Sequence, residues 1–310
     1  MIFSRFSEPI TLHPSFSLPS RAILSPLEGI MNRDFFFDAA CSLGLLDSWM
    51  PPFLGVSRGA VPSVGKLRKR FARFLDSSLP LTVQLLGNDA DSLAETALRL
   101  AECGVRSVNL NFACPSRTVV RSGSGGALLR DVRHTGEIAA ALCRRVPQIC
   151  VSVKLRSGFS CAGESGELIR RLCGAGVSWI LFHFRTVSEN YAFVGRDEAF
   201  RRIGMAVQAA GAVPVFGNGD ILTAEDAGRM REASGCAGIA VGRGFLKNPF
   251  LLREICGACP DENARRLFLE TLFRKAVSGS GRRKYDFYLE CVRMACGADS
   301  EEFQEALRRK

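Results

Sequence analysis

Short β-rich runs alternate with longer helical segments along most of this chain. We predict strands at 22–25, 53–56, 81–86, 107–111, 149–155, 178–183, 213–216 and 238–241, with helices between most of them at 89–103, 132–145, 164–174, 197–210 and 224–233. Parallel strands need long crossover connections, which helices usually supply, so this alternation indicates βαβ units. Eight strands within residues 21–245 fit a (β/α)8 TIM barrel, with a doubly wound open sheet as the alternative α/β architecture.

The two ends of the chain differ from this middle part. Residues 246–310 contain no convincing strand, and we predict helices at 263–277, 285–295 and 301–310, with a flexible break at 278–281. These residues are expected to form a small, basic, all-helical domain. Residues 1–20 include Pro9, Pro14 and Pro19, and we expect them to form a short surface extension before the barrel begins.

The charge of the chain favours anionic partners. Forty-one Lys and Arg against 31 Asp and Glu give a formal net charge of +10, which suits nucleic acids or phosphorylated ligands. Apolar residues make up 47% of the chain, which excludes a mostly disordered protein. No apolar run approaches the roughly 20 residues that span a bilayer, and the first residues lack the apolar segment of a secretory signal. We therefore expect no membrane partner and a cytoplasmic protein with reduced thiols, and we expect it to be a monomer.

Two glycine-containing turns follow the last two predicted strands. Asn218-Gly219-Asp220 comes after the seventh strand, and Gly242-Arg243-Gly244 comes after the eighth. Backbone N–H groups can approach a ligand closely where no Cβ intervenes, and an arginine adds a bidentate charge. The loops after strands seven and eight are the usual phosphate site of a TIM barrel. The sequence therefore predicts phosphate binding here, although the glycines could also serve only to make turns.

Four further side chains stand at or near predicted strand ends. Lys154 lies within a β-rich run, where it either faces a bound anion or reaches solvent. His183 and Arg185 share parity along the sixth strand, so both can face one side. Cys114 follows the fourth strand in a polar loop with nearby cations, which suits a nucleophile or an acid, and this loop could form a mobile lid.

Four cysteines in the C-terminal part are the best candidates for metal ligands. They are Cys256, Cys259, Cys291 and Cys296. Their spacing is looser than in known zinc sites, and the segment otherwise has an ordinary amphipathic pattern. We therefore predict no metal site.

Taken together, these segments resemble the tRNA-dihydrouridine synthases over roughly residues 21–255. The most specific piece runs from Asn111 through Cys114 to Val119, followed by Gly125-Gly126-Ala127-Leu128-Leu129. The other matching pieces, in family order, are Leu24-Ser25-Pro26-Leu27-Glu28-Gly29-Ile30, Val83-Gln84-Leu85-Leu86-Gly87, Val153-Lys154-Leu155-Arg156, His183-Phe184-Arg185-Thr186, Asn218-Gly219-Asp220 and Gly242-Arg243-Gly244 with Asn248-Pro249. Each piece alone is weak, but their common order along the chain makes the resemblance specific.

The resemblance implies a TIM barrel that binds FMN and a helical C-terminal domain that helps to grip tRNA. It assigns cofactor contacts to Pro26, Leu27, Glu28, Gln84, Lys154, His183, Asn218, Gly219, Asp220, Gly242 and Arg243. Lys154 would favour the reduced flavin anion. Asn111 would lie by the target base, Arg185 would also contact the substrate, and Cys114 would be the general acid.

The reaction that the resemblance implies is the reduction of a uridine in the D-loop of tRNA to 5,6-dihydrouridine. NADPH would reduce FMN, and the uridine would leave the stack to reach the pocket. FMN would then deliver a hydride to C6 of the uracil, while Cys114 would protonate C5.

The chain also departs from the usual family pattern. Asn109 stands where the family usually has Asp, Ala113 where it has Gly, Leu27 where Met is common, and Phe184 where a small residue is usual. Ala113 removes backbone freedom beside the expected acid. Glu28, Ser116 and the run 122–126 look most like the bacterial C-type subgroup, which acts on uridine 16.

Two other functions remain possible from the residues. An FMN-dependent barrel acting on a free small molecule, such as a dihydroorotate dehydrogenase, shares the phosphate site but leaves the basic helical domain unexplained. A non-catalytic RNA-binding barrel would account for the departures at Asn109 and Ala113.

Overall fold

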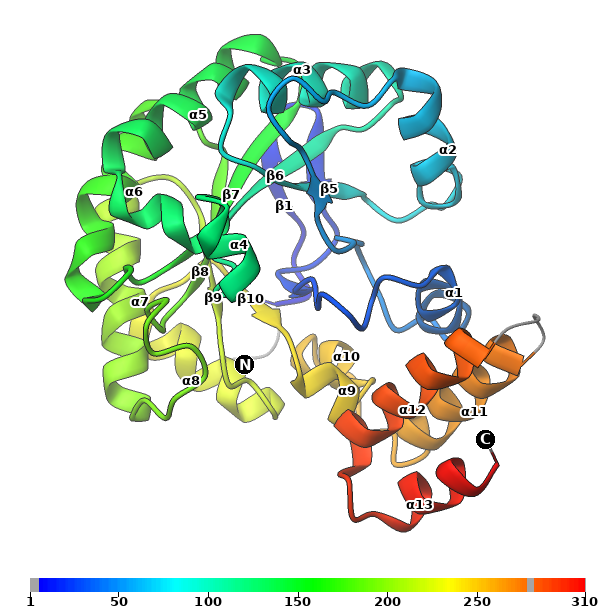
Figure 1. The fold of residues 1–310 in the computed structure, drawn as a ribbon. Helices are drawn as coiled ribbons and strands as arrows, with labels where there is room; N and C mark the ends of the chain where they lie inside the picture. Colours follow the sequence, from blue (N-terminus) through cyan, green and yellow to red (C-terminus); the bar gives the residue numbers. More distant parts are fainter. Residues whose placement is uncertain (1–5, 278–281, 310) are drawn as a thin grey trace.

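Eight parallel strands form the centre of the molecule in the computed structural model, which describes residues 6–277 and 282–309 (Figure 1). The strands are β3 Ala22–Leu24, β4 Leu54–Gly55, β5 Thr82–Leu86, β6 Ser107–Phe112, β7 Cys150–Arg156, β8 Trp179–His183, β9 Val215–Asn218 and β10 Gly238–Val241. Their order in the sheet is β3-β10-β9-β8-β7-β6-β5-β4. From β5 onward each strand lies next to its predecessor in the chain, and the first strand pairs with the last, as in a barrel. β3 and β4 stand at the two ends of this order.

Helices surround this curled sheet on the outside. They are α1 Asp34–Ser42, α2 Val64–Leu75, α3 Ala90–Glu102, α4 Arg117–Arg121, α5 Val132–Arg145, α6 Ser165–Gly174, α7 Arg196–Ala210 and α8 Ala224–Ser234, with short 3-10 helices at Gly125–Arg130 and Ala162–Glu164. The predicted TIM-barrel class is confirmed, and the doubly wound sheet is excluded by the strand order. All eight predicted strands are present, although β4 is reduced to two residues after Pro51 and Pro52.

Helix α8 illustrates how local sequence sets the elements that follow the strands. The Thr223 hydroxyl accepts a hydrogen bond from the backbone N–H of Asp226 at 3.1 Å, and the Asp226 carboxylate accepts one from the backbone N–H of Thr223 at 3.1 Å. This capping box satisfies N–H groups that have no partner inside the helix. It starts the helix six residues after β9, so the turn at the carboxyl end of β9 stays short.

The first twenty residues differ from the expected surface extension. Strands β1 Ile10–His13 and β2 Phe16–Leu18 form an antiparallel hairpin. Leu12, Phe16 and Leu18 are buried in one cluster with residues that point into the barrel, including Trp179 and Phe216. The hairpin therefore closes the amino-terminal end of the barrel, because alternate residues along it are apolar and turn inward.

The C-terminal helices lie on one side of the barrel, where α11 packs against α1 (Figure 1). They are α9 Gly244–Lys247, α10 Leu251–Ile255, α11 Ala264–Val277, α12 Arg282–Cys296 and α13 Glu301–Arg308. Aromatic rings make the contact: Phe36 lies 5.4 Å from Phe268, and Phe35 lies 5.1 Å from Phe287, between ring centroids. A boundary near residue 245 remains a prediction, since these rings join the helices to one continuous core with the barrel.

Two further points concern the comparison with the sequence-based expectations. The break predicted at 278–281 lies outside the described residues. Helices α1 and α2 were not predicted, although α2 carries the amphipathic pattern of Leu67, Phe71 and Phe74. Within the described residues, no helix is both long enough and apolar enough to cross a membrane.

Candidate functional site

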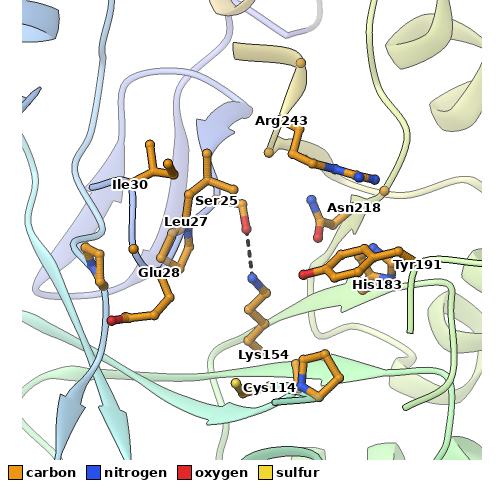
Figure 2. Close-up of a pocket in the computed structure, with 18 of the residues that line it drawn as sticks. Ser25, Leu27, Glu28, Ile30, Cys114, Lys154, His183, Tyr191, Asn218 and Arg243 are labelled. Atoms are coloured by element: carbon orange, nitrogen blue, oxygen red, sulfur yellow. Dashed lines mark hydrogen bonds between the residues drawn. The ribbon is translucent and has the colours of Figure 1, made fainter. Parts of the chain in front are cut away.

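A cavity of about 700 Å³ opens at the carboxyl ends of the strands, where TIM barrels place their active sites. It brings together thirteen of the fourteen residues that the sequence predicts for the site, and Figure 2 shows how several of them converge. They are Pro26, Leu27, Glu28, Gln84, Asn111, Cys114, Lys154, His183, Asn218, Gly219, Asp220, Gly242 and Arg243. Arg185 lies behind the wall instead. The size of the cavity suits a cofactor or a nucleotide-sized ligand.

A row of buried polar side chains supports one wall of the cavity, with Gln84 and Asn111 in the lining and Asn109 and Ser152 behind them. Gln84, Asn109 and Ser152 are register partners on the neighbouring strands β5, β6 and β7, so their side chains lie side by side. Gln84 Nε2 donates a hydrogen bond to Asn109 Oδ1 at 2.8 Å, and Asn109 Nδ2 donates one to Ser152 Oγ at 2.9 Å. Asn111 Nδ2 donates to Gln84 Oε1 at 2.9 Å. All four side chains are buried, so each needs these partners.

The direction of this row of hydrogen bonds is fixed at both ends by the backbone. At one end, Asn111 Oδ1 accepts from the backbone N–H groups of Ala113 and Cys114 at 3.1 and 3.0 Å. At the other end, the Ser152 hydroxyl donates to the carbonyl of Val108 at 3.0 Å. An N–H can only donate and a carbonyl can only accept, so every amide between them has one permitted orientation.

Two consequences follow for Gln84 and Asn109. The second N–H of Gln84 donates to Met50 Sδ at 3.8 Å, which is a weak acceptor. Asn109 both accepts and donates in this row, which an ionised Asp cannot do. The departure at position 109 is thus accommodated by a neutral group with both partners satisfied.

The loop that carries Cys114 is tied to the barrel. Besides the two bonds to Asn111, the carbonyl of Cys114 accepts from the backbone N–H of Gly126 at 3.0 Å. The carbonyl of Ala113 accepts from Arg156 Nε at 2.9 Å. Ala113 is buried and does not need a positive φ, so the departure from Gly leaves the turn unstrained. Four hydrogen bonds thus tie this segment to the barrel, and its role as a lid stays a prediction.

The Cys114 thiol is protonated at neutral pH in this environment. Burial raises the pKa of Cys114, while the backbone N–H of Ser116 and the charge of Lys154 act in the opposite direction. Lys154 lies beside it, and its Nζ donates to Ser25 Oγ at 2.9 Å (Figure 2). Burial, together with the charge of Arg156, lowers the pKa of Lys154 to about 8. The site therefore pairs a neutral thiol with a mostly charged ammonium group near pH 7.

His183 is held in its neutral form at the opposite wall. Burial lowers its pKa, and the positive charges of Arg156, Lys154, Arg185 and Arg243 lower it further. Its Nδ1 accepts from the backbone N–H of Arg185 at 3.2 Å, so the neutral ring carries its proton on Nε2. The charged residues that line the cavity are four cations (Lys154, Arg156, Arg243, Lys247) and three acids (Glu28, Asp220, Glu290). An anionic ligand would balance this small excess of positive charge.

Arg185 lies behind this wall and supports it through hydrogen bonds. It is 3% exposed, and its two Nη atoms donate to the Asp220 carboxylate at 3.1 and 2.5 Å. Its Nε donates to the carbonyl of Ala192 at 2.5 Å. Asp220 also lies 3.6 Å from Arg243 Nη2. The strand ends at His183, so the alternation that would have turned Arg185 into the cavity no longer holds two residues later.

Arg243 lines the same side of the cavity, and its side chain is half exposed. Gly242 and Gly219 flank it in the lining. Gly219 has φ +121°, and a Cβ there would lie 2.4 Å from the Phe184 ring, so only glycine fits. Phe184, the bulky residue where the family has a small one, thus packs against Gly219 and stacks on His183 with centroids 5.2 Å apart.

Sequence reasoning gave no role to several residues that shape the site. Arg156 Nη1 donates to the carbonyls of Thr186 and Asn190, both at 2.8 Å, so it joins the Cys114 loop to the loop after β8. Its shared parity with Lys154 on β7 was the available signal. Tyr191 also lines the cavity, and no motif marks it. Glu290 and Met294 show that α12 contributes to the lining, which a sequence cannot indicate.

The chain is similar to a known family over most of its length. The family model described as dihydrouridine synthase matches residues 56–278. A protein from Pseudomonas syringae pv. tomato, named tRNA-dihydrouridine(16) synthase, is 35% identical over 240 residues, which covers 76% of this chain and 74% of that protein. A Pseudomonas aeruginosa protein, named tRNA-dihydrouridine synthase B, is 31% identical over 242 residues, which covers 77% of this chain and 70% of that protein.

Among solved structures, the old yellow enzyme from Trypanosoma cruzi has a similar fold. The TM-score is 0.60 with 11% sequence identity, covering 86% of this chain and 96% of that chain. At this identity the likeness concerns the barrel itself.

Proposed function

The chain belongs to the dihydrouridine synthase family, and on this premise we propose that it reduces a uridine of tRNA to 5,6-dihydrouridine. Relatives named for position 16 support uridine 16 as the target. The similarity extends over about three quarters of the chain, which favours this function over a small-molecule oxidoreductase or a non-catalytic barrel.

The observation that carries the proposal is the placement of Cys114. Reduction of the 5,6 double bond of uracil adds a hydride at one carbon and a proton at the other. A protonated thiol on a fixed loop in the cavity can supply that proton. We assign this role to Cys114, with the proton going to C5.

The residues of the cavity fit a flavin, and we propose FMN as the particular flavin. The excess of positive charge around His183 suits an anionic group. Arg243 and the bare backbone at Gly242 suit its phosphate, and Gln84, whose second N–H has only the weak acceptor Met50 Sδ, suits a ring carbonyl. When bound, the flavin supplies the hydride that adds to C6 of the uracil, and we propose NADPH as the reductant.

The chain's own residues then manage the proton and the charge. Asn111 fixes the turn before Cys114, so the thiol keeps one position relative to the cavity. After it has given up its proton, the Cys114 thiolate lies next to the Lys154 ammonium group, which stabilises it. The polar side chains of the amide row form hydrogen bonds with one another, so none of them competes for the proton of Cys114.

The C-terminal helices support tRNA as the substrate. Glu290 and Met294 of α12 reach the lining of the cavity, so a bound loop would touch both the barrel and these helices. The net charge of +10 favours contacts with the phosphate backbone, and such contacts weaken as salt rises. We further propose that the protein acts as a cytoplasmic monomer.

The deciding experiment is conversion of uridine to dihydrouridine in unmodified tRNA. The reaction contains added FMN and NADPH, and the product is detected by mass spectrometry of nucleosides and mapped on RNase fragments. We expect dihydrouridine at position 16. Turnover of free uridine with none in tRNA would instead support the small-molecule function, and tRNA binding without any reduction would support the non-catalytic barrel.

A further inference from the structure

The loop between β8 and α7, residues 184–195, exposes an aromatic side chain that the proposed reaction does not use. Phe193 is 90% exposed, more than any other large apolar residue among those the structure describes. A single exposed apolar residue is common and needs no explanation on its own. The position of Phe193 and the rigidity of its loop indicate a role for this side chain.

Buried arginines hold the loop in place. Arg156 donates to the carbonyls of Thr186 and Asn190, and Arg185 donates to the carbonyl of Ala192, directly before Phe193. Both arginines are 3% exposed. Their bonds are therefore shielded from water, and each fixes a different point of the backbone.

The same loop is tied down on its other side. The Glu189 carboxylate accepts from the backbone N–H of Thr186 at 2.8 Å and pairs with Arg202 at 2.8 Å. The backbone N–H groups of Val187 and Ser188 donate to the carbonyls of Gly158 and Phe159. These bonds order the loop that carries Phe193, so the fold itself holds the Phe193 ring in solvent.

The loop is also part of the rim of the cavity. Tyr191, two residues before Phe193, lines the cavity and is 56% exposed (Figure 2). The guanidinium of Arg243 lies 4.9 Å from the centre of the Tyr191 ring. Leu222 and Lys247 lie on the same rim, and Lys247 is exposed. The exposed Tyr191 ring therefore stands beside positive charge, and Phe193 follows it by two residues on the same loop, which suits a phosphate-linked aromatic partner.

We propose that Phe193 is a stacking platform for an unpaired base of the RNA next to the uridine that enters the cavity. This inference rests on the proposed function. A nucleotide that leaves its stack exposes the faces of its neighbours, which then gain from a new partner. A fixed aromatic ring offers that partner at little cost in conformational freedom, and it accepts any base because every base has a flat face.

The first test measures substrate affinity and turnover separately. Stacking on one base contributes roughly 5- to 150-fold in binding, so Phe193→Ala should raise the KM for tRNA by about that factor. The kcat at saturating tRNA and the rate of flavin reduction by NADPH should stay unchanged, since Phe193 does not line the cavity. Phe193→Trp should keep the wild-type KM, and Phe193→Leu, which keeps apolar area without a ring, should resemble Phe193→Ala. Met205→Ala on α7, 40% exposed, is the matched control and should change nothing.

The second test reads stacking directly by fluorescence and needs no turnover. The two native tryptophans, Trp49 and Trp179, are each 1% exposed, so an exposed tryptophan dominates any response to RNA. The emission of Phe193→Trp should be quenched when tRNA binds, and that of Met205→Trp should not. A fully paired RNA duplex should quench Phe193→Trp less, because its bases have no free faces.

The two tests separate this inference from the function on which it rests. Wild-type activity on tRNA with an unchanged KM in Phe193→Ala overturns the platform and leaves the function intact. The same holds if tRNA binds Phe193→Trp without quenching. If tRNA quenches the emission of Phe193→Trp but the wild-type protein forms no dihydrouridine, the platform stands and the proposed reaction is wrong.

Discussion

The two walls of the cavity handle polar groups in opposite ways. On the side of β5, β6 and β7, Gln84, Asn109 and Asn111 are neutral and bond mainly to one another and to the backbone. On the side of β8, β9 and β10, Arg185, Asp220 and Arg243 are charged, and the cations outnumber the acid. The neutral wall fixes directions, whereas the charged wall leaves a net attraction for an anion. One barrel can therefore orient the groups of one wall and attract an anion to the other with separate sets of residues.

Removing the acid from the neutral wall should have the largest effect. Cys114→Ala takes away the proton donor, and general acids contribute roughly 10²- to 10⁴-fold. We expect turnover to fall by about that factor, while flavin content and tRNA affinity stay as in the wild type. Dihydrouridine formation and absorbance of the bound flavin give the two readings. Full activity in this variant would assign the proton to another group.

Removing positive charge from the wall of β8, β9 and β10 should affect flavin binding more than turnover. Arg243→Ala loses a charge-assisted contact, which corresponds to roughly 10- to 100-fold in the dissociation constant of FMN. Arg243→Lys should recover part of this loss, because it keeps the charge without the fork. Titration of the flavin-free protein measures both variants. Unchanged affinity in Arg243→Ala would place the phosphate elsewhere.

Placing a titratable group in the neutral wall should make stability depend on pH. In Asn109→Asp, the buried carboxyl replaces the amide only when it is protonated, since the O–H then donates to Ser152 as the amide does. Its folded-state pKa should lie above its unfolded value of about 3.9. Stability is then full below pH 4 and is lost as the pH rises through the folded-state pKa.

Asn109→Ala is the matched variant for this comparison. It leaves the Gln84 donor and the Ser152 hydroxyl without their partner at every pH, at a cost of roughly 1–3 kcal/mol. Urea denaturation at pH 4 and pH 8 distinguishes the two variants from the wild type. A pH-independent stability in Asn109→Asp would mean that the row can reverse its direction.

The smallest effect is expected from the titration of Lys154, which lies between the two walls. Lys154 has a pKa of about 8, so its charge is present below that pH and is lost as the pH rises through it. Turnover should therefore decline by a few fold above pH 8, before the Cys114 thiol, whose pKa is raised, gives up its proton. Lys154→Arg should move this decline to higher pH, and an unmoved decline would assign it to another group.

The charged wall was largely predictable from sequence, and the neutral wall was not. Gly219 and Arg243 follow strands in a local pattern whose chemistry is plain. Asn109 and Ser152 are far apart in the sequence, and only the register of β6 on β7 shows that they are partners. Arg185 illustrates the limit of parity arguments, because it stands just beyond the end of its strand. Tyr191 belongs to a loop that buried arginines position, so no local pattern marks it.

The fold itself was predictable where periodicity was strong. Helix α5 has the predicted bounds, Val132–Arg145, since its apolar spacing and its cap at Asp131 agree. The hairpin of β1 and β2 was missed because its strands are short and His13-Pro14 interrupts them. Its role depends on Phe16 and Leu18 meeting the open end of a barrel that the local sequence does not describe.

The pairing of β3 with β10 has a consequence for synthesis on the ribosome. Ala22 pairs with Ile239, so the first barrel strand leaves the ribosome roughly 200 residues before its partner. At about 5–20 residues per second, this edge stays unpaired for roughly 10–40 s. The apolar hairpin that precedes it needs the finished barrel interior and waits as long. The nascent chain therefore carries an open strand edge through most of translation, and its early segments are where a chaperone would have to bind.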